Sequence, residues 1–195
     1  MERAIAVILS GGQSRRMGRD KAGLTLEGQS FLDRMTEGLV PLFDQVYVSV
    51  DRPGRYPGRQ ELPDLRPGQG PLAGLETAFL RTGAEEVFLA AVDLPFVSPD
   101  LARWVVAAAG DGDACVIRRR DGGAEPLFAL YRRSCLPALT ACLDEGRRAV
   151  KALLERVDCR WLEEDALDEF DLERALWNIN TQADFSRASE RREEK

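Results

Sequence analysis

The residues with the most evident chemistry in this sequence lie in one glycine-rich and basic segment, residues 9–21 (LSGGQSRRMGRDK). Gly11 and Gly12 allow the backbone to turn tightly and to approach a ligand closely. Three arginines and Lys21 follow them, and basic side chains beside a glycine turn are typical of phosphate binding. The segment predicts a nucleotide-binding loop, with a solvated surface loop as the alternative. Its spacing matches neither the GxxxxGK[ST] loop of P-loop ATPases nor the GxGxxG loop of dinucleotide-binding enzymes.

Asp93 is the second candidate, because it directly follows an almost wholly apolar run at residues 87–92. Pro95 would suit a turn, so one interpretation is that Asp93 only caps that turn. The other is that it binds a hard cation, since Mg²⁺ takes one or two carboxylates together with substrate phosphates. Ligands of open α/β sheets bind at the carboxyl ends of the strands. Because Asp93 and the glycine loop would share that edge, we expect a Mg²⁺ site at Asp93.

Two further polar motifs fall where strands of such a sheet would end. Residues 68–74 (GQGPLAG) predict a glycine turn into a helix whose first backbone amides can face a ligand. In the second motif, Asn178 and Asn180 would point to the same side if the chain is extended there. The alternative is that these asparagines only hold the turn into a final helix, which Thr181 and Asp184 can cap.

The composition removes several classes of catalyst. The sequence has no histidine, which excludes Ser-His-Asp and Cys-His nucleophile systems and the HExxH metal site. Its four cysteines form no CxxC pair, so a zinc knuckle or a thioredoxin-type redox site is not expected. The chemistry therefore falls to carboxylates, lysine, arginine, amides, backbone donors and a bound metal ion.

Charge and hydropathy limit the partners and the location. The net charge is −6, and phosphate-backbone binding draws on a basic surface, so we expect no nucleic-acid partner. No apolar run approaches the roughly 20 residues that cross a bilayer, so we expect no membrane partner. Met1–Arg3 lead straight into an apolar run without a signal-peptide pattern, which favours a cytoplasmic protein.

The elements that must position these residues alternate between strand and helix. This alternation predicts an α/β fold, a three-layer Rossmann-like sandwich with a mostly parallel sheet. The expected strands are residues 4–9, 45–50, 87–92, 114–117 and 127–131. The expected helices are residues 30–39, 71–83 and 98–110, and two more within 133–157 that break at Gly146. A proline-rich polar loop would follow residue 50. Residues 1–185 would form a single domain, and residues 186–195 a charged, frayed tail.

Taken in order, five motifs resemble one known family. They are LSGGxSRRMGxDK, GPLAG, DLPF, EPLFALY and NINT, and they run from the first strand to about Asp184. This set is similar to the bacterial molybdenum cofactor guanylyltransferases, which have a nucleotide-diphospho-sugar transferase fold. The resemblance implies a nucleotidyltransferase domain that transfers GMP from MgGTP to the terminal phosphate of molybdenum-bound molybdopterin and releases pyrophosphate. Further partners that the sequence leaves open are an accessory GTP-binding protein, a molybdenum-insertion protein and a molybdoenzyme chaperone.

The resemblance also assigns roles to residues of the matching motifs. The nucleotide would contact Leu9, Ser10, Gly11, Gly12, Lys21, Asp64, Gly70 and Asp93. Lys21 and Arg15 would neutralise the phosphates and the leaving pyrophosphate, and Asp93 would bind Mg²⁺. Asp64 would lie near the nucleoside and could accept hydrogen bonds from guanine. Asn178 and Asn180 would face the pterin.

Two positions depart from the family pattern: Ser49 stands where Asn is frequent, and Ser10 replaces the commoner Ala. The proposed chemistry explains the missing histidine, because the attacking phosphate oxygen is already anionic and needs no general base. Three alternatives remain. The first two are a cytidylyl enzyme for the same pterin, whose relatives tend to read AAG at residues 10–12, and a sugar-1-phosphate enzyme of the same fold. The third is a non-catalytic nucleotide-binding adaptor, against which the joint presence of Lys21 and Asp93 argues.

Overall fold

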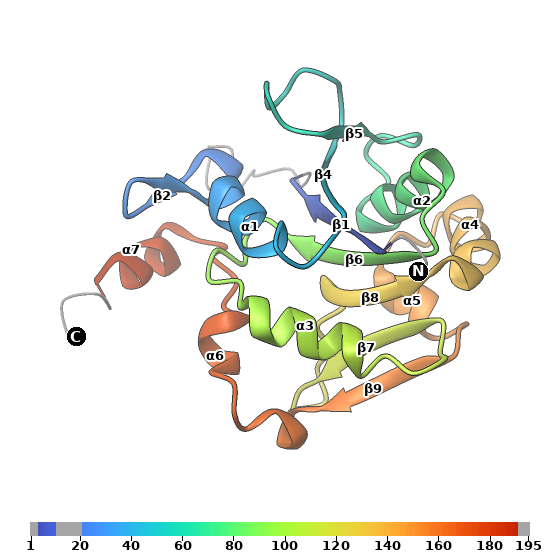
Figure 1. The fold of residues 1–195 in the computed structure, drawn as a ribbon. Coiled ribbons are helices and arrows are strands. Elements are labelled where there is room, and N and C mark those ends of the chain that lie inside the picture. Colours follow the sequence, from blue (N-terminus) through green and yellow to red (C-terminus); the bar gives the residue numbers. More distant parts are fainter. Residues whose placement is uncertain (1–3, 11–20, 191–195) are drawn as a thin grey trace.

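The fold is built on one seven-stranded sheet with the strand order β5-β4-β1-β6-β8-β7-β9 (Figure 1). The computed structural model describes residues 4–10 and 21–190. The strands are β1 (Ala4–Leu9), β4 (Gln45–Val50), β5 (Glu61–Pro63), β6 (Glu86–Ala91), β7 (Ala114–Arg118), β8 (Phe128–Arg132) and β9 (Cys159–Glu163). All neighbouring strands pair in parallel except at β8, which is antiparallel to both β6 and β7. The expectation of a mostly parallel sheet is confirmed.

Helices cover both faces of the sheet and complete three layers (Figure 1). One face packs against α1 (Phe31–Leu39), α3 (Pro99–Ala107), α6 (Leu172–Ala175) and α7 (Gln182–Glu190). The other face packs against α2 (Pro71–Thr82), α4 (Leu136–Asp144) and α5 (Val150–Leu154). Short 3₁₀ turns η1 (Lys21–Gly23), η2 (Arg133–Cys135) and η3 (Glu164–Leu167) and a small hairpin of β2 (Thr25–Leu26) and β3 (Gln29–Ser30) link these elements.

The central strand β1 shows why the sheet is buried on both sides. Ile5, Val7 and Leu9 pack into the core under α2, whereas Ala6 and Ile8 pack into the core under α1. Successive side chains of a strand point to opposite faces, so a strand covered on both faces reads as a continuous apolar run. No helix among the described residues is long and apolar enough to cross a membrane.

Local signals set the helix ends where the sequence predicts them. The Ser30 side chain accepts a hydrogen bond from the Asp33 amide at the start of α1. Ser98 does the same for Leu101 at the start of α3. Gly83 closes α2 with a φ of 69°, a left-handed conformation in which glycine carries no Cβ penalty.

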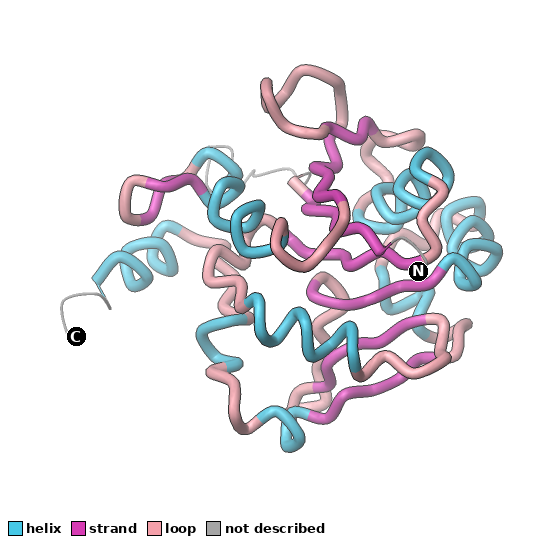
Figure 2. Tube along the Cα trace, viewed as in Figure 1, coloured by secondary structure: helices cyan, strands magenta, loops and turns pink. Residues whose placement is uncertain are grey.

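The structure differs from the sequence expectations in several places. The predicted proline-rich polar loop after residue 50 (Figure 2) is interrupted by β5, which pairs in parallel with β4. Strand β6 begins and ends one residue earlier than predicted, and Val92 lies in the turn closed by the Leu94 amide on the Ala91 carbonyl. Strand β9 was not predicted. It contains the exposed charged residues Arg160 and Glu163, so its sequence does not show the apolar pattern of a buried strand, although it pairs with β7.

The first part of the segment predicted as a charged tail is helical in the structure. Residues 186–190 belong to α7, which continues to Glu190. The Thr181 hydroxyl accepts from the Asp184 amide, and the Asp184 carboxylate accepts from the Thr181 amide. This reciprocal cap is the predicted one, and it supports a helix beyond residue 185. Residues 191–195 lie outside the described residues.

Candidate active site

The candidate site lies where the carboxyl ends of β5, β4, β1 and β6 meet at one edge of the sheet. In open α/β sheets this edge binds the ligand, because the loops that leave parallel strands gather there. The loops after these strands carry Ser10, Asp64 and Asp93. Three of the predicted site residues, Gly11, Gly12 and Arg15, lie outside the described residues.

Lys21, Asp93 and Asn180 form a cluster at this edge. The Lys21 ammonium donates to Asp93 Oδ2 over 3.0 Å and to Asn180 Oδ1 over 2.7 Å. The Lys21 and Asp93 side chains are 17% and 20% exposed, so the ion pair is largely shielded from water. The backbone holds the same arrangement, because the Ile179 amide donates to the Asp93 carbonyl over 2.9 Å. The structure therefore brings Asp93 of the DLPF motif and Asn180 of the NINT motif into contact with Lys21, the last residue of the glycine-rich basic segment.

The remaining oxygen of the Asp93 carboxylate gives the site its clearest chemical signal. Asp93 Oδ1 is buried and has no hydrogen-bond partner in the described part of the chain. A buried polar atom without a partner costs free energy that a bound cation would recover. The described residues hold no cluster of three or more His, Cys, Asp or Glu side chains that could bind a metal. A carboxylate of this kind fits Mg²⁺, which completes its coordination with phosphate oxygens and water.

A second buried oxygen without a partner lies on the loop that leads into α2. It is Gln69 Oε1, beside Gly70, and like Asp93 Oδ1 it lacks a partner within the described residues. Gly70 has a φ of 79° and precedes Pro71 at the first turn of α2, where no side chain caps the helix. The helix therefore presents its first amides at the candidate site. Sequence reasoning named Gly70 but passed over Gln69, although Gln69 lies inside the GQGPLAG motif.

The loop before α2 is fixed by two polar side chains that sequence reasoning missed. Thr77 accepts a hydrogen bond from the Leu65 amide over 2.9 Å, and Glu76 pairs with Arg66 over 2.9 Å. Glu76 is only 2% exposed, although it is an acidic residue of a helix. The sequence held one signal, because Glu76 and Thr77 interrupt an otherwise apolar stretch, residues 72–79, which is buried throughout.

Ser10, Ser49 and Asp64 form a hydrogen-bonded chain across the ends of β1, β4 and β5. The Ser10 hydroxyl donates to the Ser49 carbonyl over 2.6 Å, and the Ser49 hydroxyl donates to Asp64 Oδ1 over 2.7 Å. Burial raises the pKa of the Asp64 carboxyl, the Ser49 hydrogen bond lowers it, and the nearby charge of Asp51 raises it, with a net upward shift. Leu9 is buried beside this chain.

The segment that carries Asn178 and Asn180 packs through aromatic rings. Phe96 and Trp177 stack with centroids 5.8 Å apart, and the Arg174 guanidinium lies 5.0 Å from the centre of the Phe96 ring. Asn180 reaches Lys21, whereas the Asn178 amide lies 3.5 Å from the Leu176 carbonyl. The structure thus brings Asn180 into the cluster and leaves Asn178 exposed beside it.

The EPLFALY motif lies beside the end of β6, because the Ala91 amide donates to the Leu127 carbonyl over 2.9 Å. The Tyr131 hydroxyl donates to the Pro126 carbonyl over 2.7 Å and anchors the start of the motif. Phe128 lies edge-on to Phe88 in the core. Most of the motif therefore supports the sheet, and its first residue, Glu125, lies half-buried near Arg119.

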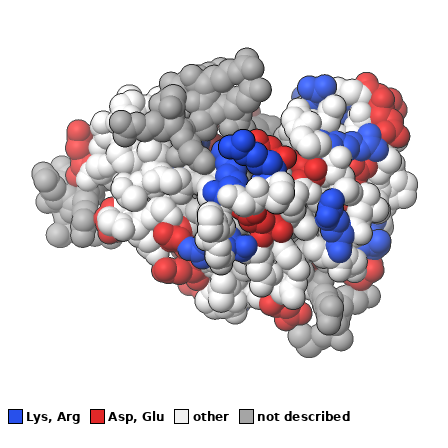
Figure 3. Space-filling view, turned by 90° about the horizontal axis from the view of Figure 1, so that it is seen from above, with Lys and Arg blue, Asp and Glu red and all other residues white. Residues whose placement is uncertain are grey.

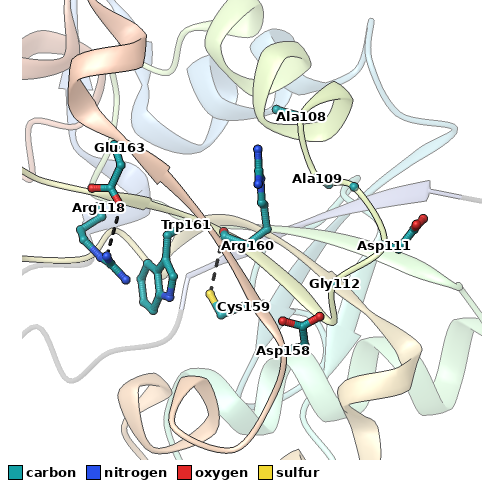
Figure 4. Close-up of a pocket in the computed structure, with 11 residues that line it drawn as sticks. Ala108, Ala109, Asp111, Gly112, Arg118, Asp158, Cys159, Arg160, Trp161 and Glu163 are labelled. Carbon is teal, nitrogen blue, oxygen red and sulfur yellow. Dashed lines mark hydrogen bonds and ion pairs between the residues drawn. The ribbon is translucent and has the colours of Figure 1, made fainter.

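A cavity of about 600 Å³ lies elsewhere, along the edge strand β9 (Figure 4). The Arg118 guanidinium lies 4.2 Å from the centre of the Trp161 ring and pairs with Glu163 over 3.1 Å. None of the predicted site residues lines this cavity.

The surface charge is mixed. On the face seen in Figure 3, basic and acidic side chains lie next to each other.

Comparison with known proteins identifies the family. A family model described as "MobA-like NTP transferase domain" matches residues 6–161.

The chain belongs to the MobA-like NTP transferase family.

Named relatives of this MobA-like chain agree with each other. It is 32% identical to a probable molybdenum cofactor guanylyltransferase of Pelotomaculum thermopropionicum, over 96% of this chain and 93% of that protein. It is 36% identical to a probable molybdenum cofactor guanylyltransferase of Deinococcus radiodurans, over 75% and 76% of the two chains. The fold superposes on molybdopterin-guanine dinucleotide biosynthesis protein A from Archaeoglobus fulgidus with a TM-score of 0.85 and 26% identity, over 98% and 100% of the chains.

A more distant likeness concerns the fold alone. The MobA-like chain resembles 2-C-methyl-D-erythritol 4-phosphate cytidylyltransferase from Thermus thermophilus with a TM-score of 0.67 and 18% identity, over 97% and 98% of the chains. The family resemblance expected from the motifs and the α/β fold class expected from the alternation of strands and helices are confirmed, and the chain is a nucleotidyltransferase.

Proposed function

We propose that this chain is a molybdenum cofactor guanylyltransferase, with GTP and molybdenum-bound molybdopterin as its substrates and Mg²⁺ as its cofactor. The observation that carries the proposal is the Lys21–Asp93–Asn180 cluster, with its unpaired Asp93 oxygen, at the carboxyl edge of the sheet. The relatives named molybdenum cofactor guanylyltransferase support the choice of base and acceptor.

The reaction needs charge stabilisation more than proton transfer. A terminal phosphate oxygen of the pterin attacks the α-phosphorus of GTP, the bond to the β-phosphate oxygen breaks, and pyrophosphate leaves. The attacking oxygen is anionic at neutral pH, which suits a chain without histidine. Lys21 would bind the phosphates and stabilise the leaving group. Mg²⁺ held by Asp93 would polarise the phosphate oxygens.

The two asparagines would serve the second substrate. An amide offers both donors and an acceptor, which matches a pterin edge or its phosphate. Asn180 also orients Lys21 through its side-chain oxygen, so its amide nitrogen is directed to a different partner. In this proposal Asn180 links the phosphate-binding lysine to the pterin, and Asn178 contacts the pterin from the neighbouring exposed position.

The test is pyrophosphate release by the purified protein with GTP, CTP or ATP, with molybdenum-loaded molybdopterin, a sugar 1-phosphate or no acceptor, and with and without a metal chelator. GTP binding is measured in parallel. We expect release with GTP only when both the loaded pterin and Mg²⁺ are present. Equal release with CTP would favour a cytidylyl enzyme. Release with a sugar 1-phosphate in place of the pterin would favour the sugar-nucleotide enzyme. Tight GTP binding without any release would favour an adaptor.

A further inference from the structure

Two buried serines, one directly after β1 and one within β4, contact each other. Ser10 and Ser49 are 5% and 3% exposed, so both hydroxyls are inside the protein. Ser10 binds the Ser49 carbonyl through its hydroxyl over 2.6 Å and through its amide over 3.4 Å. The Ser49 hydroxyl then donates to Asp64 Oδ1 over 2.7 Å. We call these three residues the Ser10–Ser49–Asp64 chain.

This chain fixes the orientation of one carboxylate at the nucleotide edge. The Asp64 amide donates to the Val50 carbonyl over 2.9 Å, which holds the Asp64 backbone beside the end of β4. The Ser49 hydroxyl is the only side-chain hydrogen-bond partner of the Asp64 carboxylate within the described part of the chain. An ionised carboxylate has about four acceptor positions, so the single hydrogen bond from Ser49 does not saturate it.

Close packing leaves the Ser49 hydroxyl little freedom. A Cβ atom added at Gly74 of α2 would lie 2.9 Å from Ser49 Oγ and 2.7 Å from Leu9 Cδ2. Both distances are shorter than van der Waals contact, so only glycine lets α2 approach this point without a shift. Gly74, the second glycine of GPLAG, therefore has a specific role: it leaves room for the Ser49 hydroxyl that reaches Asp64.

We propose that Ser49 is a positioning residue for base selection: its hydroxyl holds Asp64 so that the carboxylate accepts hydrogen bonds from the nucleobase of the bound triphosphate, and Ser10 holds Ser49. This inference rests on the proposed function, because it takes the nucleoside of GTP to lie at this edge. Guanine offers two adjacent donors, N1–H and the 2-amino group, which match the acceptor oxygens of a carboxylate. Hypoxanthine lacks the 2-amino group, and xanthine has an oxygen in its place.

Electrostatics gives Ser49 a second effect on the same group. Asp64 accepts hydrogen bonds at both oxygens only when it is ionised. Burial and the charge of Asp51 raise the pKa of the Asp64 carboxyl, whereas the Ser49 hydrogen bond lowers it. Without that hydrogen bond the pKa rises further, so ionisation of Asp64 is lost at a higher pH. The loss of GTP binding on acidification, which we call the acidic limb, then begins at a higher pH.

The experiment is equilibrium binding of GTP, CTP, ITP and XTP with Mg²⁺ and without the pterin, from about pH 4 to pH 8, which is upward from the ordinary pKa of an aspartate carboxyl. The variants are Ser49→Ala, Ser49→Thr, Ser10→Ala and Asp64→Asn, each checked by circular dichroism and thermal unfolding. For Ser49→Ala we expect GTP binding about tenfold weaker, a smaller GTP-over-ITP preference, and the acidic limb at higher pH. Ser49→Thr, which keeps the hydroxyl, should retain the selectivity.

The Asp64→Asn variant and one further variant, Gly74→Ala, separate positioning from folding. Asp64→Asn should shift the preference from GTP to XTP, because an amide donor matches the 2-oxygen of xanthine and repels the 2-amino group of guanine. Gly74→Ala should reduce the GTP-over-ITP preference while the protein stays folded, because the new methyl group displaces the Ser49 hydroxyl. The effects of Ser10→Ala and Ser49→Ala on GTP binding should be less than additive, as for residues of one hydrogen-bonded chain.

The outcomes distinguish this inference from the proposed function. Wild-type protein that prefers CTP, or binds no nucleotide, would overturn the proposed function and this inference with it. Wild-type protein that prefers GTP, with a folded Ser49→Ala variant that keeps the same selectivity and the same pH limb, would overturn this inference alone. Asp64→Asn protein with unchanged preference for GTP would also overturn it.

Discussion

Lys21 and Asp93 neutralise each other across the candidate site, with 3.0 Å between the ammonium nitrogen and one carboxylate oxygen. The motifs assign opposite tasks to these residues, since Lys21 is expected to bind phosphates and Asp93 a cation. A partly buried charge without a partner is costly, and the ion pair removes that cost for both. A magnesium nucleotide carries both a cation and phosphates, so each residue can exchange its partner for one of the same charge. The pair is thus suited to binding metal and nucleotide together.

Replacing Lys21 with alanine should slow GMP transfer by about 100-fold or more and weaken GTP binding, because a point charge at the phosphates is lost. Initial rates of pyrophosphate release and equilibrium GTP binding measure the two effects. Lys151→Ala is the matched control, since Lys151 is an exposed lysine of α5. If the Lys21→Ala protein binds GTP and turns over like the parent, Lys21 does not contact the phosphates.

Replacing Asp93 with asparagine should remove Mg²⁺-dependent transfer and leave the fold intact. The amide keeps the shape of the side chain but loses the negative charge that holds a cation, and we expect a rate lower by roughly a hundredfold or more. The measurement is the transfer rate over a range of Mg²⁺ concentrations. Asp100→Asn, at an exposed aspartate of α3, is the control. Unchanged magnesium dependence in folded Asp93→Asn protein would show that the metal binds elsewhere.

Replacing Asn180 with alanine should impair transfer to the pterin more than GTP binding. The variant removes the acceptor that holds the Lys21 ammonium at 2.7 Å and the amide nitrogen proposed to meet the pterin. We expect the transfer rate to fall by about 10- to 100-fold. Asn178→Ala tests the neighbouring amide, which has no contact with Lys21 in the structure. Equal losses of both activities, or a loss of folded protein, would instead mean that Asn180 holds the turn into α7.

Replacing Glu76 with alanine should destabilise the fold by about 1–3 kcal/mol, because two hydrogen-bonded contacts of a buried carboxylate are lost. These contacts are with Arg66 over 2.9 Å and with the Thr140 hydroxyl over 2.9 Å. Urea denaturation gives the free energy of unfolding. Asp144→Ala is the internal control: it removes the exposed partner of the same Arg66, and we expect a loss below about 1 kcal/mol. Similar losses in the two variants would contradict the role of burial.

The cap of α7 should depend on pH. Hydrogen bonds from Thr181 and Arg187 lower the pKa of the Asp184 carboxyl to about 2, from its ordinary value of 3.8. A carboxyl with a lowered pKa stabilises the fold above its unfolded-state pKa, and this contribution is lost as the pH falls through the folded-state value. Amide hydrogen exchange in α7 should therefore accelerate between about pH 4 and pH 2, beyond the intrinsic change. In Asp184→Asn protein, whose amide does not titrate, this acceleration should disappear.

Much of the fold follows from local signals. Strands β1 and β6 are buried on both faces, so their continuous apolar runs predict them from the sequence. Ser30 fixes the start of α1 through a local hydrogen bond. Strand β9 could not be predicted from the sequence, because Arg160 and Glu163 face solvent and only the pairing with β7 makes this segment a strand. The antiparallel direction of β8 likewise depends on its pairing with β6 and β7, which no local pattern encodes.

The candidate site, like the fold, could be predicted only in part from the sequence. Residue types and motif order single out Lys21, Asp93 and Asn180, and the structure brings these three together. The contact between Ser49 and Asp64 was not predicted, because it joins the ends of two strands across a 15-residue separation. Glu76 was missed because an acidic residue in a helix is normally exposed, and only its tertiary partners make it a buried anchor.

The contact between Lys21 and Asn180 spans 159 positions of the sequence, and this separation has a consequence in time. Strands β1, β4 and β6 all lie before residue 92, so three of the seven strands can pair before residues 178–180 have been synthesised. Such a nascent chain has Lys21 and Asp93 but no amide to orient the lysine. The cluster is completed only after residues 178–180 are synthesised, so a growing chain pairs its central strands well before it acquires the complete cluster.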